Sequence, residues 1–203
     1  MSRLIIYGMP ASRAIRTLWM AHELGIPYEN VPVGIADGGT KKAHYLAVNP
    51  NGRIPAINDG GFVLFESMAI NHYLAKKHDK GLAPKTLAEE AQTLQWCFWA
   101  MTEVEKPLIT WAFNTLVYAP EQRDAKLAAQ ALADLEKPLN VIDAHLKRTP
   151  HLIGSGFTVA DLNVAAVMFR ATKLDLAKLP NLKRWLETCL GRPAAKSAFK
   201  LRE

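Results

Sequence analysis

The sequence predicts two parts of different class: a small α/β domain with a mixed sheet, followed by an all-helical domain. In the first eighty residues, short apolar stretches typical of strands alternate with segments of helical period. From about Leu87 onward, apolar residues recur only at helical spacing. The stretch between them contains Gly81 and Pro84, as linkers do. We therefore expect an α/β domain over residues 1–78, a linker over 79–86 and a helical domain over 87–203.

The first strand and helix are predicted by the stretch that opens the chain. "LIIY" (residues 4–7) is a short apolar strand, and helical spacing then runs from Ile15 to Gly25, a natural C-terminal stop. "YENVPV" predicts a second strand, and Pro32 marks it as an edge strand.

A hairpin and a further helix complete the first half. "RIPAIND" and "FVLF" predict two strands joined by an Asp-Gly turn, and a helix follows from about Ser67 to Lys77. The order β-α-β then β-β-α predicts a small mixed sheet with helices on its faces.

The second half contains long helical periods over residues 91–116, 123–147, 159–172 and 182–190, and we expect Pro107 to kink the first of them. In "FTVADLNV", Thr158 as N-cap and Asp161 three residues on form a capping-box pattern. We therefore assign this acid to helix stability rather than to catalysis.

Composition restricts the classes of function. The net charge of +6 is spread among interleaved acidic residues, which favours a solvated basic surface over a nucleic-acid groove. No apolar run reaches membrane-spanning length, and the apolar stretch at the start is too short for a signal peptide. Cys97 and Cys189 lie in apolar helical patterns without metal-ligand spacing, so we expect buried free thiols, no metal and a cytoplasmic protein.

Pro55 stands inside the predicted third strand, where proline is unusual because it has no N–H to donate. If the Ile54–Pro55 bond is cis, the chain bends and turns the backbone groups of Ile54 outward. Those groups can then pair with a short extended peptide, as an added strand would. A trans proline at a strand edge is the alternative.

Glu66 and Ser67 begin the predicted third helix. Ser67 is a candidate N-cap, and the N–H groups at a helix start suit a carboxylate ligand. Glu66 is placed to receive an ammonium group, so a ligand with an amine and a carboxylate on one carbon would satisfy both residues. The alternative is a simple cap beside a surface glutamate.

Ser12 lies between the first strand and the first helix, where its hydroxyl can donate a hydrogen bond to an incoming thiolate. A free thiol titrates near ~8.5, and lowering its pKa by ~2 units requires only ~2.7 kcal/mol. The alternative is that Ser12 only caps the helix.

Together, "YGMPASRAIR", "NPNGRIPAI" and "FESMAI" resemble the glutathione-binding half of cytosolic glutathione S-transferases of bacterial type, and the resemblance extends into "FTVADLNVAAVM" and "PNLKRWLETCLGRPAAK". It implies a thioredoxin-like N-terminal domain, an all-α C-terminal domain and a homodimer. It also implies a detoxifying transferase that conjugates glutathione to hydrophobic electrophiles, with no metal, nucleic acid or membrane involved.

The resemblance assigns roles to the residues of these motifs. Ile54 with cis Pro55 would hold the cysteinyl backbone of glutathione, and Arg53 would lie beside the peptide. Glu66 and Ser67 would hold its γ-glutamyl end.

The glycyl carboxylate would meet a basic residue of "GGTKKAHY". Lys41, Lys42 and His44 are the candidates, and Lys41 is nearest in spacing.

The thiol position departs from the family pattern. Zeta-like spacing counted back from Arg16 puts Met9 where related proteins have serine, whereas beta-like spacing leads to Ser12. Tyr7 falls within the strand, so it does not match the tyrosine of the mammalian-type pattern. We assign the thiolate contact to Ser12 and count Met9 among the substrate contacts.

The aromatic residues of the first long helical period are expected to be mostly core or dimer contacts. Because this helix overlooks the thiol in the family, Trp111, Asn114 and Tyr118 are our candidate contacts for the electrophile.

Two alternatives to the transferase remain. The same site could serve isomerisation, dehalogenation or peroxide reduction, although the lack of cysteine in "MPAS" argues against disulfide exchange. The chain could also be a binding relative without chemistry.

Overall fold

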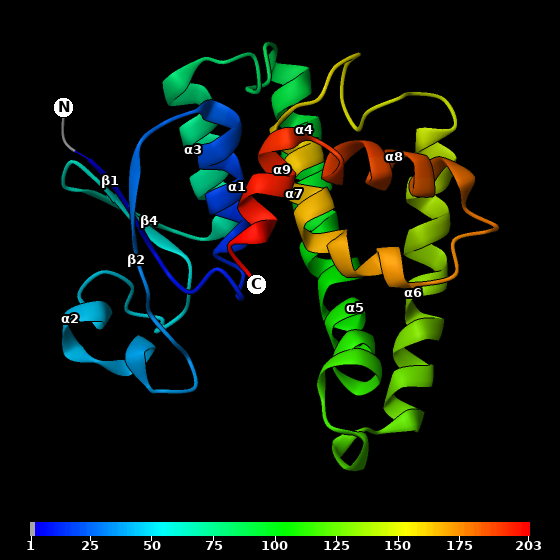
Figure 1. The fold of residues 1–203 in the computed structure, drawn as a ribbon. Helices are drawn as coiled ribbons and strands as arrows, with labels where there is room; N and C mark the ends of the chain where they lie inside the picture. The colour runs from blue at the N-terminus through cyan, green and yellow to red at the C-terminus, as the bar shows by residue number, and fades with distance from the viewer. Residues whose placement is uncertain (1–2) are drawn as a thin grey trace. The chain divides into compact units, whose positions relative to one another are not determined.

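The computed structural model describes residues 3–203, which form two compact units (Figure 1). The first comprises the residues up to Ala83 together with Arg192–Glu203, and the second comprises Pro84–Gly191. These bounds differ from the predicted domains mainly at the C-terminal end, where the last twelve residues join the α/β unit. Each unit is described by itself.

The first unit is built on a four-stranded sheet in the order β2-β1-β3-β4. The strands are β1 (Leu4–Tyr7), β2 (Tyr28–Val31), β3 (Ala56–Asp59) and β4 (Phe62–Phe65). β1 pairs with β2 in parallel and with β3 antiparallel, and β3 pairs antiparallel with β4. The predicted mixed sheet is therefore confirmed, with β2 at an edge. Gly60 and Gly61 join the hairpin, both with positive φ (64° and 96°), which suits a tight β-turn.

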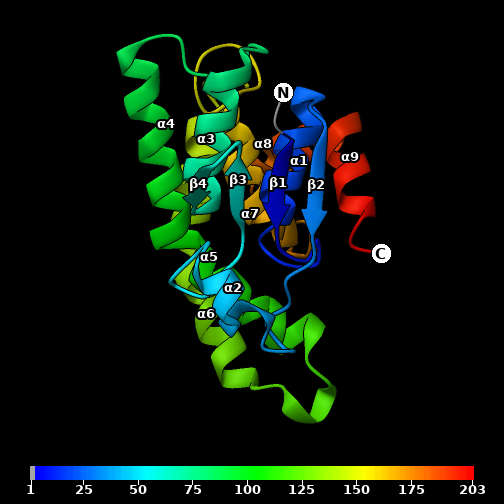
Figure 2. The same cartoon turned by 90° about the vertical axis from the view of Figure 1, so that its left-hand side faces the viewer.

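The α-helices of this unit lie around the sheet (Figures 1 and 2). They are α1 (Ile15–Leu24), α2 (Ala43–Leu46), α3 (Ser67–His78) and α9 (Pro193–Lys200). α1 and α3 lie side by side against one face of the sheet (Figures 1 and 2), and α9 packs against α1. α1 stops at Gly25, whose φ of 61° is left-handed, as predicted. Tyr45 of α2 packs against the ring of Tyr7 at the end of β1, with 6.0 Å between the ring centroids.

The second unit is entirely helical, as predicted. It consists of α4 (Leu87–Trp99), α5 (Glu105–Ala112), α6 (Ala125–Leu146), α7 (Val159–Met168) and α8 (Pro180–Leu190). Every residue of α7 is buried, so this helix is the centre of the unit. Pro107 lies in the first turn of α5, directly after a π-helical turn over Ala100–Val104. Proline cannot donate to the carbonyl four residues earlier, so an irregular turn is expected there.

Three further features bear on function. No helix within residues 3–203 combines the length and apolar character needed to cross a membrane. Over the same residues, no three His, Cys, Asp or Glu side chains gather in a way that could hold a metal ion. Cys97 and Cys189 are buried and form no disulfide, which confirms the prediction made for them.

Candidate functional site at one end of the sheet

Strand register brings the predicted site residues of the first unit to one end of the sheet. Tyr7, the last residue of β1, lies opposite both Val31 and Ala56. Ala56 in turn lies opposite Phe65, so Pro55 and Glu66 flank the same end of the hairpin. The loops after β1 and β2, the approach to β3 and the start of α3 therefore meet there.

The loop after β1 folds back tightly because of Gly8. Its φ is 134°, and a Cβ placed there would lie 2.8 Å from the Cβ of Ala14 and 3.1 Å from that of Ile54. Only glycine allows this close approach without a shift of its neighbours. Gly8 thus brings the segment that carries Ser12 against the residue that precedes the cis proline.

Ser12 is half-buried, and its hydroxyl makes two local hydrogen bonds. The Oγ donates to the carbonyl of Met9 at 2.6 Å and accepts from the N–H of Ala14 at 3.1 Å. The N-cap of α1 is Ala14, so the alternative in which Ser12 is the N-cap is wrong. A ligand that takes a hydrogen bond from Ser12 must therefore replace the carbonyl of Met9 as acceptor.

A cavity of about 370 Å³ opens beside Ser12. Ser12 lines it together with Met9 and Ala11 from the loop after β1, Ile54, and residues Gly34, Ile35, Ala36 and Asp37 from the loop after β2. The volume is in the range of small-molecule sites. Sequence reasoning missed the 34–37 segment, and the only signal was the polar, glycine-containing stretch after the second strand.

The Ile54–Pro55 bond is cis, as the position of the proline suggested. β3 begins only at Ala56, so the backbone groups of Ile54 lie outside the strand ladder. The preceding carbonyl, that of Arg53, accepts hydrogen bonds from the Tyr45 hydroxyl (2.5 Å) and from Nδ2 of Asn49 (2.7 Å).

Tyr45 and Asn49 are thus supports of the bend that sequence reasoning missed. Burial raises the pKa of Tyr45 to about 12, so its hydroxyl remains a donor at neutral pH. The Oδ1 of Asn49 accepts from the N–H of Asn51 at 3.1 Å, which fixes the turn of "NPNG". The side chain of Arg53 itself is exposed.

Glu66 has an unusual backbone conformation at the start of α3. Its φ is 73° and its ψ is 110°, a region that non-glycine residues rarely occupy and that occurs most often at functional sites. Its side chain is exposed. This strained backbone supports a role for the exposed side chain of Glu66 in binding a ligand.

Ser67 is buried behind Glu66. The expectation that Ser67 is the N-cap is wrong, because it is the first helical residue and Glu66 occupies the cap position. Its Oγ accepts a long hydrogen bond (3.4 Å) from Nη1 of the buried Arg16. The backbone of Arg16 is held in turn by Asn71, whose Nδ2 donates to its carbonyl at 3.1 Å.

The three basic residues that are candidates to meet the glycyl carboxylate lie in and directly before α2. Lys41 ends a short 3₁₀ turn, Lys42 is the N-cap of α2, and His44 lies within the helix. All three side chains are exposed, so the geometry does not select one of them.

The candidate electrophile contacts belong to two different units. Met9 lines the cavity of the first unit and is 42% exposed. Trp111, Asn114 and Tyr118 belong to the second unit, where Trp111 and Asn114 are buried and Tyr118 is exposed. The amide of Asn114 is already used, since it donates to the carbonyl of Thr110 at 2.8 Å and accepts from the N–H of Asp124 at 3.0 Å.

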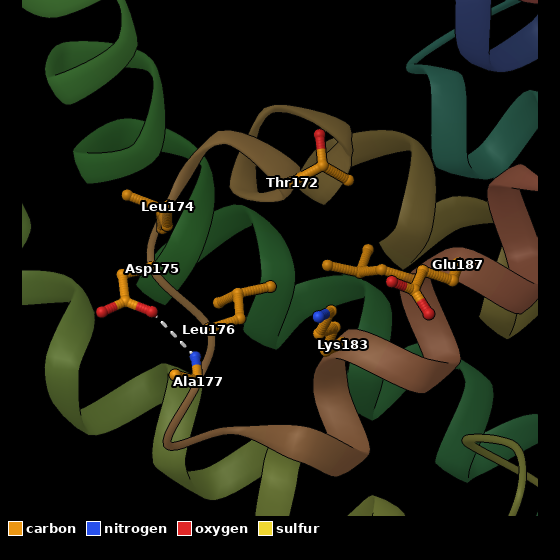
Figure 3. A pocket seen from close by; sticks show the side chains of 8 residues that line it. Thr172, Leu174, Asp175, Leu176, Ala177, Lys183 and Glu187 are labelled. Atoms are coloured by element: carbon orange, nitrogen blue, oxygen red, sulfur yellow. Dashed lines mark hydrogen bonds between the residues drawn. The ribbon is translucent and has the colours of Figure 1, made fainter.

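The second unit has a cavity of its own, of about 320 Å³, between the 172–177 segment and α8. Figure 3 shows its lining, in which leucine side chains lie near Lys183 and Glu187 of α8. Asp175 also lines it and accepts a hydrogen bond from the N–H of Ala177 at 2.9 Å. None of the residues predicted for the site lines this cavity.

Family models match two parts of the chain. Residues 2–76 match the model described as glutathione S-transferase, N-terminal domain, and residues 104–193 match the one described as glutathione S-transferase, C-terminal domain.

Individual relatives extend this match over most of the chain. Glutathione S-transferase 3 of Zea mays is 37% identical over 96% of this chain and 92% of its own length. Elongation factor 1-gamma of Equus caballus is 32% identical over 93% of this chain, which spans only 44% of that protein. Among solved structures, the theta class glutathione S-transferase of Xanthomonas axonopodis pv. citri with glutathione bound is 31% identical, with a TM-score of 0.90 and 98% of each chain covered.

Proposed function

The chain belongs to the glutathione S-transferase family, and we propose that it is an enzyme that joins the thiolate of glutathione to hydrophobic electrophiles. The observation that carries this proposal is the cavity that Ser12 and Ile54 both line, at the sheet end shared with Glu66. A cytoplasmic, detoxifying role belongs to the same proposal, and the two buried free thiols suit a reducing compartment.

In this proposal glutathione lies extended beside Ile54. The backbone groups of that residue are outside the strand ladder and can pair with the cysteinyl unit as an added strand would. Glu66 receives the ammonium group of the γ-glutamyl end, and the N-terminus of α3 with Ser67 receives its carboxylate. Arg53 and Lys41, both exposed, supply positive charge along the peptide and at the glycyl carboxylate.

The chemistry requires little beyond a lowered thiol pKa and proximity. The Ser12 hydroxyl rotates from the carbonyl of Met9 to the incoming sulfur and donates its hydrogen bond there. The positive end of α1 favours the ionised sulfur as well. The thiolate then attacks an electrophilic carbon, and, for an aryl halide, the C–S bond forms as the carbon–halogen bond breaks and halide leaves with the bonding pair. Met9, Trp111, Asn114 and Tyr118 are the proposed contacts of the electrophile.

A second candidate is a relative that binds glutathione without chemistry. It is favoured by the match to elongation factor 1-gamma and by the hydrogen bond that already occupies the Ser12 hydroxyl. The unusual backbone of Glu66 supports a bound ligand under either candidate.

The experiment that separates the two is a glutathione titration followed by ultraviolet difference spectroscopy across the pH range. S-methylglutathione, which cannot ionise at sulfur, is the matched control. A thiolate band with an apparent pKa well below that of free glutathione supports the transferase, and conjugation of a chromogenic aryl halide should then follow.

Glutathione that binds without a thiolate band would favour the binding relative. Binding of neither compound would contradict both candidates.

A further inference from the structure

The last described residues of the chain return to the loop that carries Ser12. α9 is fastened to α1 by an ion pair in which Arg192 donates to both carboxylate oxygens of Glu23, at 2.7 and 2.8 Å. The ring of Phe199 meets Trp19 edge-on, with centroids 6.0 Å apart. This packing fixes where the chain leaves α9.

Arg202, two residues after α9, contacts the backbone of the Ser12 loop. Its Nη1 donates to the carbonyl of Pro10 at 3.1 Å and to that of Ser12 at 3.5 Å. Both hydrogen bonds come from the same nitrogen, so Arg202 holds the two carbonyls close to one point. Arg202 and Ser12 are separated by 190 positions in the sequence, so no local pattern would reveal this contact.

The loop whose carbonyls Arg202 holds also forms part of the cavity wall. Met9, Ala11 and Ser12 line the cavity, whereas Arg202 and Pro10 do not. Holding the Pro10 and Ser12 carbonyls on the guanidinium therefore keeps the rest of the loop turned to the cavity.

The positive charge of Arg202 also favours a negatively charged ligand atom beside this loop. An arginine remains protonated at neutral pH, and this one is partly buried, so its field is screened less than that of a surface charge. The described charged side chains nearest in sequence are Arg13 in the loop and Lys200 and Glu203 beside Arg202, all exposed. Exposed charges of this kind contribute less at the loop because water screens them.

We propose that Arg202 is a positioning residue of the thiol site, which holds the Ser12 loop toward the cavity and adds positive charge that favours the ionised sulfur. This inference rests on the proposed transferase function. It adds a residue that the motifs of the first eighty residues do not contain.

The test compares Arg202→Gln, Arg202→Lys and the control Lys200→Gln, which removes the same charge from an exposed position two residues away. We expect Arg202→Gln to raise the apparent pKa of bound glutathione by roughly half a unit to one unit, whereas affinity for S-methylglutathione stays within about twofold. Arg202→Lys should recover part of the shift, because it keeps the charge but replaces the guanidinium whose Nη1 reaches both carbonyls. Equal pKa values in Arg202→Gln, Lys200→Gln and the native protein would overturn the inference.

Failure of the proposed function itself is distinguishable. If the native protein shows no thiolate band, hydrogen exchange of the Ser12 and Ala14 amides, measured without ligand, decides the role of Arg202. These amides donate to the Met9 carbonyl and to the Ser12 Oγ. Exchange at least about fivefold faster in Arg202→Gln than in Lys200→Gln supports a positioning role, and equal exchange overturns it.

Discussion

At the scale of single residues, Ser12 is part of both the turn before α1 and the wall of the cavity. Its hydroxyl stabilises the turn by accepting from the N–H of Ala14. The hydroxyl donates a hydrogen bond to the carbonyl of Met9, and a ligand could replace this carbonyl as the acceptor because Ser12 is only half-buried. A bound thiolate is a better acceptor than a neutral carbonyl because it is charged.

Ser12→Ala should lower kcat at least about tenfold and leave glutathione affinity within a few-fold, because only the ionised sulfur loses a donor. Ser12→Thr keeps a hydroxyl and should retain much of the activity. Steady-state kinetics and calorimetric titration measure the two quantities. Unchanged turnover in Ser12→Ala would remove Ser12 from the catalytic role.

Cys97 provides a prediction about pH. Burial raises the pKa of this thiol from 9.0 to about 11, and Nδ2 of Asn163 lies 3.3 Å from its sulfur. Below pH 9 the thiol is neutral in the folded and unfolded states and has no effect on the pH dependence. Between about pH 9 and 11 only the unfolded state loses the proton, so this thiol makes the free energy of unfolding fall as pH rises, by up to about 1.4 kcal/mol per pH unit.

The measurement is urea unfolding of the native protein and of Cys97→Ala from pH 8 to pH 11. The tyrosines that titrate in this range are common to both proteins, so the difference between the two curves isolates the thiol. We expect the free energies of unfolding of the two proteins to converge above pH 9, because only the native protein has the Cys97 thiol, whose ionisation in the unfolded state lowers its stability. Parallel curves would contradict the raised pKa.

At the scale of elements, the capping residues at the N-terminus of α7 also connect this helix to neighbouring segments. The predicted capping box between Thr158 and Asp161 is present. Asp161 is fully buried and also accepts hydrogen bonds from the N–H of Leu152 (2.9 Å) and from Nε1 of Trp185 (2.8 Å). These contacts join the segment before α7 to α8, which supports a structural role for this acid.

Thr158→Ala should lower the free energy of unfolding by ~1 kcal/mol, the usual effect of losing an N-cap side chain. The catalytic constants should not change. Thr158→Ser, which keeps the hydroxyl, is the matched control in the same denaturant titration. A variant of native stability with lowered kcat would contradict the structural assignment.

At the scale of the whole molecule, the proposed binding of glutathione and most of the proposed contacts to the electrophile belong to different units. The α/β unit contains every residue proposed to bind glutathione, and the helical unit contributes three of the four proposed contacts to the electrophile. The α/β unit also draws its last helix from the opposite end of the chain, since α9 packs against α1.

A homodimer is the remaining proposal at this scale, and it is supported by membership of the family. Light scattering at micromolar concentration should give a mass twice the 22.5 kDa of one chain. A single-chain mass under those conditions would reject the dimer. If the doubled mass is found, dilution to nanomolar concentration would measure how tightly the two copies associate.

The sequence alone predicted much of the fold. The helix stop at Gly25, the hairpin turn at Gly60 and the cap at Thr158 follow from local backbone chemistry, in which one residue type suits one conformation. Pro55, predicted within the third strand, lies directly before it, and its bond to Ile54 is cis, one of the two alternatives that its position had suggested. The predicted N-cap at Ser67 was wrong by one residue, because helix boundaries are the least certain part of such predictions.

Only the tertiary structure decided how the site is assembled. The 34–37 segment of the cavity wall, the donation of Tyr45 to the Arg53 carbonyl and the contact of Arg202 with the Ser12 loop have no local sequence signature. Each depends on register or packing between segments that the chain brings together only when folded. Local propensity therefore determined the elements and the motif residues, whereas long-range contacts decided which of those residues share a cavity and what holds them there.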